Sequence, residues 1–186
     1  MFFEQVVRRE TGCVSYVCGC PGGGECTVID PLWDPAPYTR IAQSEGVSIR
    51  YVIDTHSHAD HVSGVRRLAQ LTGADLLLHE LAQLEYPARR VKDGDTFRMG
   101  SVRMEILHTP GHRPEHIIVA ISDLSRTPEP WMICTGDFVL VGDIARPDLA
   151  QSAAEGAGEL FDKALPRVAG LPDHVGVYPG HVGGST

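Results

Sequence analysis

The sequence predicts a single α/β domain in which sheets pack face to face with helices outside. Three observations lead to this prediction. The chain has 186 residues, of which 42% are hydrophobic, so it can bury a core of several layers. Strand-like, helix-like, strand-like and helix-like segments follow one another along it. No linker or internal repeat interrupts this order, and residues 1–186 are therefore expected to form one domain.

The first part of the chain is strand-like. Three short segments there are rich in β-branched and aromatic residues, which favour strands: residues 2–7, 13–19 and 25–30. Pro21 and the glycine run 22–24 predict a tight turn between the second and third segments. A phosphate-binding glycine loop would open into a helix, whereas a strand-like segment follows here. A β-meander is the expected structure.

Two helices are expected next, on either side of a strand. Residues 35–46 and 61–73 have helical periodicity and end at glycines, and residues 48–55 between them are typical of a buried strand. The second helix has four apolar side chains at helical spacing: Val62, Val65, Leu68 and Leu71.

The second half of the chain is again expected to consist of strands followed by a helix. Five strand-like segments are expected at residues 74–80, 95–100, 102–109, 116–122 and 131–137, with turns at 99–101 and 125–130. A helix interrupted by glycine is expected over residues 152–168, and a last strand at 175–180.

Composition narrows the classes of function and the cellular location. The formal net charge of -8 and dispersed basic residues argue against nucleic acid or an anionic membrane as a partner. No apolar run is long enough to span a membrane, and Glu4 interrupts the early apolar stretch, so export or anchoring is not expected. The five cysteines are odd in number, which favours reduced thiols and a cytoplasmic location.

A short turn after residue 55 contains four side chains that commonly bind metals. The stretch "THSHADH" brings His56, His58, Asp60 and His61 together at the end of a predicted strand. Such a cluster is costly to hold together unless a cation or hydrogen bonds compensate it. The sequence therefore predicts a metal site here.

Three later loops complete the candidate site. "TPGH" ends in His112, "TGD" in Asp137 and "PGH" in His181, and each loop follows a predicted strand. The remaining histidines lack such a context and are expected to be ordinary core or surface residues: His79, His108, His116 and His174.

These four motifs, in this order, resemble the metallo-β-lactamase superfamily across essentially the whole chain. The resemblance implies a four-layer αββα sandwich with its metal site at one edge of the two sheets. Hydrolases, oxidoreductases and nucleases all use this scaffold, so the fold alone does not fix the reaction.

Three further stretches resemble the persulfide dioxygenases of the branch often fused to rhodanese domains: "CVSYVCGCPGGGECTVIDP", "GDFVLVGDIARPDL" and "VGVYPGHVGGS". Ala145 stands where that group has glycine, and residues 122–130 have the character of an insertion. Because the chain stops at Thr186, a rhodanese region is expected to be absent or removed.

By this resemblance His56, His112 and Asp137 bind one Fe(II) per chain. His58, Asp60, His61 and His181 would then act as catalytic or outer groups that hydrogen bond to ligands, water or substrate. Two imidazoles and one carboxylate leave open positions on iron for a thiol persulfide and O2, which would give thiol and sulfite.

Two residues are candidates for binding the substrate. The guanidinium of Arg146 can bind a carboxylate or phosphate in a fork, although an ordinary salt bridge is an equally good interpretation. Tyr178 is a candidate for lining the pocket, although a tyrosine on a strand more often serves packing.

The main alternative is a dinuclear zinc hydrolase resembling glyoxalase II and acting on a thioester. One zinc would be held by His56, His58 and His112, and the other by Asp60, His61 and His181, with Asp137 as the bridge. Against it, that resemblance implies a C-terminal helical domain for which the chain leaves no room. A nuclease is less favoured because of the acidic balance.

A non-catalytic metal or sulfur carrier is the remaining alternative. Cys18, Cys20 and Cys26 could serve it, but their spacing lacks the paired Cys-x2-Cys pattern of structural zinc sites. The expected partners are a small-molecule thiol persulfide and O2, with no nucleic acid and no membrane. A homodimer and a rhodanese domain partner stay open.

Overall fold

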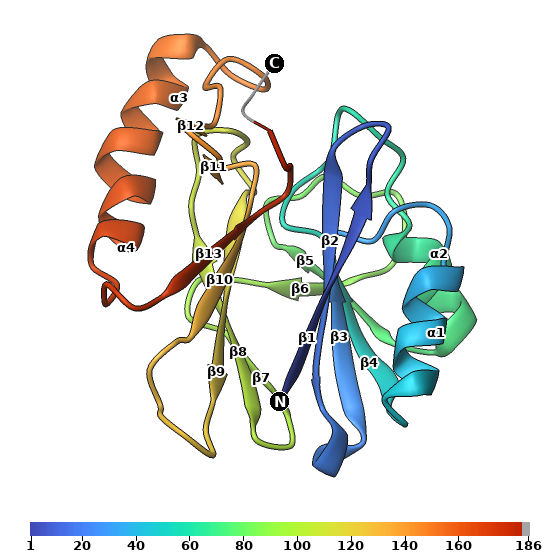
Figure 1. Ribbon diagram of the computed structural model, residues 1–186. Coiled ribbons are helices and arrows are strands. Elements are labelled where there is room, and N and C mark those ends of the chain that lie inside the picture. Colours follow the sequence, from blue (N-terminus) through green and yellow to red (C-terminus); the bar gives the residue numbers. More distant parts are fainter. Residues whose placement is uncertain (184–186) are drawn as a thin grey trace.

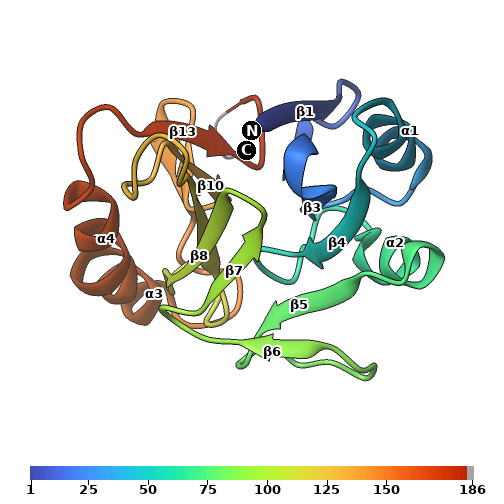
Figure 2. The ribbon, with the colours of Figure 1, turned by 90° about the horizontal axis from the view of Figure 1, so that it is seen from below.

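The computed structural model describes residues 1–183 and contains two sheets that face each other, with helices on both outer faces (Figures 1 and 2). This is the predicted four-layer αββα arrangement. None of the helices in residues 1–183 combines the length and the apolar character that crossing a bilayer requires.

The first sheet has six strands in the order in which they occur along the chain. They are β1 (Phe2–Arg8), β2 (Cys13–Cys20), β3 (Glu25–Ile29), β4 (Ser48–Ile53), β5 (Asp75–His79) and β6 (Arg89–Val91). The meander β1–β2–β3 is antiparallel, and β3 to β6 are parallel. A one-turn helix, η1 (Pro21–Gly23), makes the predicted turn, because Gly24 adopts a φ of 67°.

The second sheet has five strands in the order β13-β10-β9-β8-β7. They are β7 (Thr96–Met99), β8 (Val102–His108), β9 (Ile117–Asp123), β10 (Met132–Gly136) and β13 (Gly176–Pro179). β7 to β10 form an antiparallel meander, and β13 joins β10 in parallel. A small hairpin of β11 (Val139–Leu140) and β12 (Asp143–Ile144) follows β10.

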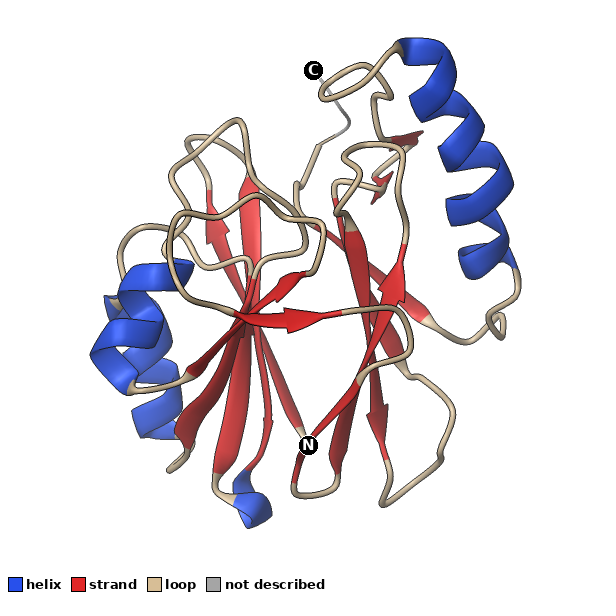
Figure 3. Cartoon of the chain, turned by 180° about the vertical axis from the view of Figure 1, so that it is seen from behind, coloured by secondary structure: helices blue, strands red, loops and turns tan. Residues whose placement is uncertain are grey.

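Helices cover the outer faces, as the view from behind also shows (Figure 3). α1 (Ala36–Ser44) and α2 (Val65–Thr72) lie on the first sheet. α3 (Ala153–Glu159), the π-helical turn η2 (Leu160–Ala164) and α4 (Leu165–Ala169) lie on the second. Ser152 and Glu155 form a capping box at the start of α3.

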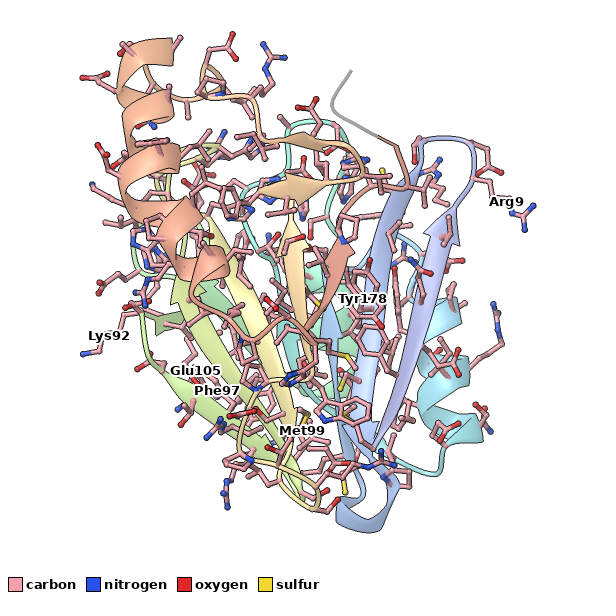
Figure 4. The ribbon with its side chains drawn as sticks, turned by 60° about the vertical axis from the view of Figure 1, so that its left-hand side comes forward. Arg9, Lys92, Phe97, Met99, Glu105 and Tyr178 are labelled. Carbon is pink, nitrogen blue, oxygen red and sulfur yellow. The ribbon has the colours of Figure 1, made fainter. Side chains whose placement is uncertain are left out.

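The main core lies between the sheets. Side chains from both inner faces interdigitate there, and most are fully buried, among them Tyr16, Met99, Met104 and Ile117. Figure 4 labels Phe97 and Met99 of β7, which belong to this cluster. Burial of this apolar surface provides the main driving force for folding and fixes the two sheets relative to each other.

Some local predictions were wrong. α2 begins at Val65 rather than His61, and Val62 and Leu71 are 68% and 63% exposed, so only Val65 and Leu68 of that apolar set are buried. The chain before Gly64 is held in a loop by the site residues described below. β6, β11 and β12 were not predicted, because strands of two or three residues carry too little periodicity.

His79 supplies a test of stability against pH. Its ring is 3% exposed and stacks on His108 at 4.2 Å between centroids. Burial and the neighbouring His108 lower the pKa of His79 from 6.5 to about 4. Between these values the unfolded chain binds a proton that the folded chain does not, so this residue makes stability fall as the pH drops.

We expect His79→Gln to reduce the acid loss of stability between pH 6.5 and pH 4.5 by on the order of 1 to 2 kcal/mol. Urea denaturation at several pH values measures this difference. His174→Gln, which changes an exposed histidine, is the control and should leave the pH dependence unaltered. Equal slopes for His79→Gln and the unmodified protein would contradict the prediction.

Candidate metal centre

The loops that carry the four motifs meet at one edge of the two sheets, where their side chains lie close together. His56 follows β4, His112 follows β8, Asp137 follows β10 and His181 follows β13. β8 and β10 are both antiparallel to β9, and β13 is parallel to β10, so their carboxyl ends lie on the same side. This topology explains why residues distant in the sequence converge.

His56, His112 and Asp137 form the centre of this edge, and we call them the triad. Asp137 Oδ2 lies 3.9 Å from His56 Nε2 and 3.8 Å from His112 Nε2. The three ligating atoms all lie within 4.8 Å of one another. Both histidines are buried, at 2% and 5% exposure.

The proton positions on both imidazoles follow from their partners. The Thr55 hydroxyl donates its proton to Asp30 Oδ2 at 2.9 Å, so it must accept a proton from His56 Nδ1, 3.0 Å away. His112 Nδ1 lies 3.3 Å from the carbonyl oxygen of Arg146, which can only accept. Each Nε2 is therefore a bare lone pair directed toward Asp137.

These groups suit a cation. Burial lowers the pKa of both His56 and His112, so both rings are neutral. Burial alone would raise the pKa of Asp137, but the hydrogen bond and charge of His181, together with the charges of His112 and His58, outweigh it and lower the pKa, so the carboxyl stays ionised. Two lone pairs and a carboxylate thus face one another with no hydrogen between them. A bound divalent metal ion relieves this arrangement.

His58 lies outside the triad. Its Nε2 is 3.3 Å from Asp30 Oδ1 and 3.9 Å from Asp54 Oδ1. Burial lowers the pKa of His58, but the hydrogen bond and charge of Asp30 outweigh this effect and raise the pKa to about 9. His58 is thus a cation paired with Asp30, and its ligating atom joins Asp60 and His61 or Asp30 and Asp54 rather than the triad.

Asp60 and His181 line the open side of the centre, and His61 contacts Asp60. Asp60 Oδ1 is 3.0 Å from His61 Nδ1, and Asp60 Oδ2 is 3.5 Å from His181 Nε2. His181 Nε2 is also 3.4 Å from Asp137 Oδ1, and the bond to Asp137 raises the pKa of His181. Asp60 and His181 thus lie beside the triad, whereas His61 groups with His58 and Asp60.

Asp30 is a site residue that sequence reasoning missed. It is 3% exposed and accepts the backbone N–H of Thr55 at 2.6 Å in addition to the Thr55 hydroxyl. It has a φ of 51°, which is rare for a residue other than glycine. Its position between the end of a strand and Pro31 was the available signal. It connects β3 to the loop that carries His56.

His116 was expected to be an ordinary core residue, and it is buried directly behind the triad. Its ring lies 5.2 Å from that of His56 and 6.0 Å from that of His112. Nδ1 is 2.9 Å from the Thr109 hydroxyl, and burial lowers the pKa of His116 to about 3. It therefore packs as a neutral ring against both triad histidines.

A cavity of about 250 Å³ opens onto the triad. It is lined by His56, Ala59, Asp60, His112, Asp137, Leu140, Ala145, Arg146, Leu149 and His181. Arg146 is thus at the cavity, as predicted, but its guanidinium also holds Asp148 at 2.9 and 3.1 Å. The salt-bridge interpretation is confirmed, and binding of a substrate carboxylate or phosphate stays a prediction.

Tyr178 does not line this cavity, which corrects the prediction. It is part of an aromatic cluster between the sheets, with its ring 4.7 Å from Phe3 and 5.8 Å from Tyr16 (Figure 4). Successive side chains of a strand alternate between its faces, and on β13 this position faces the first sheet.

Tyr178→Ala should therefore affect stability and not the site. We expect the free energy of unfolding to fall by roughly 2 to 3 kcal/mol, because the truncation leaves a gap beside two aromatic rings. Metal content and the KM of the folded variant should be unchanged. Thermal denaturation and steady-state kinetics measure these two effects, and Tyr178→Phe is the matched control. A raised KM at full stability would return Tyr178 to the substrate pocket.

The family model described as the metallo-beta-lactamase superfamily matches residues 8–181 of this chain. The chain belongs to the metallo-β-lactamase superfamily. This confirms the predicted superfamily and fold, and superfamily members are metal-dependent enzymes.

Relatives within the superfamily have different activities. The human mitochondrial persulfide dioxygenase ETHE1 is 28% identical, over 90% of this chain and 63% of its own length. A hydroxyacylglutathione hydrolase of Polaromonas sp. is 33% identical, over 90% of this chain and 61% of its own. A solved metallo-beta-lactamase from Staphylococcus aureus has a TM-score of 0.91 at 35% identity, over 97% of this chain and 56% of its own. The chain thus spans 56% to 63% of these relatives.

Proposed function

We propose that this protein is a non-haem iron persulfide dioxygenase. It would oxidise a low-molecular-weight thiol persulfide, such as glutathione persulfide, with O2 and water to thiol and sulfite. In this reaction the S–S bond breaks, the terminal sulfur loses four electrons, and O2 gains them.

One observation carries the proposal: two imidazole Nε2 atoms and one carboxylate oxygen converge, while His58 is paired with Asp30. Two histidines and one carboxylate on one face of an ion are the ligand set of non-haem Fe(II) oxygenases, and they leave open positions for two reactants. Iron bound there would supply the redox chemistry between the persulfide sulfur and O2.

The residues that line the cavity outside the triad would position the substrate. Leu140, Ala145 and Leu149 give the cavity an apolar wall that excludes water from the reacting sulfur. Arg146, at the rim and 51% exposed in its side chain, is suited to a carboxylate of the thiol, which would compete with Asp148. His181 Nε2 holds a proton between Asp60 and Asp137, within reach of a bound anion.

His58, Asp60 and His61 contribute in different ways under this proposal. Asp60 lines the cavity, where it can order water or substrate, and His61 fixes the orientation of its carboxylate. His58 acts through Asp30, as a positioning residue for the loop that carries His56. The likeness to human persulfide dioxygenase ETHE1 supports this function.

A dinuclear zinc thioester hydrolase is the second candidate. The likeness to the Polaromonas hydroxyacylglutathione hydrolase favours it, and so does the position of Asp60 and His181 beside the triad, where they could help to hold a second ion. Metal-activated water would then attack the thioester.

The decisive experiment is metal analysis of anaerobically purified protein combined with two assays. One iron per chain, with O2 uptake on glutathione persulfide, supports the dioxygenase. Two zinc ions per chain, with thioester cleavage and no O2 uptake, would replace it with the hydrolase.

A further inference from the structure

Glu115 is a buried carboxylate near the triad that the proposed reaction does not use. The residue is 5% exposed and stands three positions after His112. Its Oε1 accepts a hydrogen bond from Arg113 Nε at 2.7 Å and another from the backbone N–H of Ser57 at 3.2 Å. Ser57 comes directly after His56 in the sequence. One carboxylate oxygen therefore connects the two loops that carry the triad histidines.

The Ser57 amide is bonded by a side chain because the two backbones separate here. Ile117, the first residue of β9, donates its N–H to the Thr55 carbonyl at 2.9 Å, which joins the chain after β4 to the second sheet. Two residues beyond Thr55 and two residues before Ile117, the Ser57 N–H meets the carboxylate of Glu115 instead of a backbone carbonyl. A hydrogen bond to a charged acceptor is stronger than one to a neutral carbonyl. This bond thus fixes the turn that follows His56.

Glu115 also balances the positive charge of Arg113. The side chains of this ion pair are 6% and 25% exposed, respectively. Burial would raise the pKa of Glu115, but the hydrogen bonds from Arg113 and Ser57 outweigh it and lower the pKa, so the carboxyl is ionised. The guanidinium is close enough to act on the triad, because its charge adds to burial in lowering the pKa of both His56 and His112. A positive charge that disfavours a proton on these rings also disfavours a metal ion beside them.

We propose that Glu115 is a positioning residue of the metal centre with two roles. It holds the loop of His56 against the loop of His112, and it neutralises Arg113 so that the triad can take up a divalent cation. Glu115 acts through Ser57 and Arg113 and is not itself one of the candidate ligands. The inference rests on metal binding by the triad, which the proposed function requires, and it applies to iron and zinc alike.

Two substitutions separate these roles. Glu115→Gln keeps an oxygen acceptor for the Ser57 amide and removes the charge, whereas Glu115→Ala removes both. In anaerobic Fe(II) titrations we expect iron affinity to fall by about 10-fold in Glu115→Gln and by about 100-fold in Glu115→Ala. Adding Arg113→Gln to Glu115→Gln should recover most of the lost affinity, because no unbalanced guanidinium then lies beside the triad. An ion pair with a merely structural role would give no such recovery.

Amide hydrogen exchange of the metal-free protein tests the loop directly. The Ser57 amide should exchange at least about 10-fold faster in Glu115→Ala than in the unmodified protein. Glu10→Gln is the matched control, because Glu10 pairs with Arg8 at the same spacing of two residues but has a side chain that is 79% exposed. It should alter neither the exchange of Ser57 nor the affinity for iron.

The possible outcomes are distinct. Unchanged iron affinity in a folded Glu115→Ala variant, or no recovery in the double variant, would overturn the proposal, and circular dichroism checks that each variant is folded. If the unmodified protein binds no Fe(II), the proposed function fails, and the same variants are then titrated with Zn²⁺ and read by the same two criteria. Equal exchange of Ser57 in Glu115→Ala and the unmodified protein would contradict the loop role whichever metal is bound.

Discussion

Replacing Asp137 with alanine should leave the protein folded and remove its metal. Asp137 provides the one negative charge among the three triad groups, and Oδ2 is within 3.9 Å of both histidine nitrogens. Without it, two neutral imidazoles remain. We expect iron affinity to fall by at least about 100-fold, and O2 uptake to fall with it.

The fold should survive this change because Asp137 lies in a loop after β10 and contributes no strand pairing. Metal analysis, oxygen-electrode assay and thermal denaturation measure the three properties on one preparation. His174→Ala, which removes an exposed histidine, is the control and should keep full iron content. An Asp137→Ala variant that retains one iron per chain would show that the ion lies elsewhere.

Asp30→Ala should have the second-largest effect. It should lower both the free energy of unfolding and the affinity for the metal. Asp30 accepts the N–H and hydroxyl of Thr55 and pairs with buried His58. Removing it leaves these groups without a partner and forces alanine into a φ of 51°. We expect the free energy of unfolding to fall by roughly 3 to 5 kcal/mol.

The effect on the metal has a specific cause. Without Asp30, the Thr55 hydroxyl is free to donate to His56 Nδ1, which moves the imidazole proton to Nε2, the atom facing Asp137. Iron affinity should therefore fall by about 10- to 100-fold in the protein that remains folded.

Asp30→Asn separates the two roles of this residue. Asparagine tolerates a positive φ and keeps an acceptor for Thr55, but it lacks the charge that pairs with His58. We expect a smaller loss of stability and a smaller loss of iron than in Asp30→Ala. Urea denaturation and iron titration measure both. Equal iron affinity in Asp30→Ala and the unmodified protein would contradict the account of Thr55.

Much of the fold could be predicted because its long segments carry clear periodicity. The strand at 102–108 alternates buried and half-buried residues, and the helix at 65–72 ends at Gly73, which has a φ of 73°. The start of that helix could not be predicted. Val62 fits the apolar period, but the preceding loop is held by contacts such as that of Ser63 with Asp54, which no local pattern reveals.

In the candidate site, too, some features could be predicted from the sequence and others could not. The convergence of His56, His112 and Asp137 could be predicted because each stands in a motif after a strand, and the topology brings those strand ends together. Asp30 could not, because its role depends on which neighbours the sheet supplies. Tyr178 was misassigned since its motif adjoins the site while its side chain points into the core.

The central claim is that His56, His112 and Asp137 bind one metal ion while His58 does not. Anomalous diffraction at the iron and zinc absorption edges, from crystals of anaerobically purified protein, tests it most directly. The account predicts a single iron peak bonded to His56 Nε2, His112 Nε2 and a carboxylate oxygen of Asp137, with His58 still paired with Asp30. A peak bonded to His58, or the absence of any ion among the three triad residues, would contradict it.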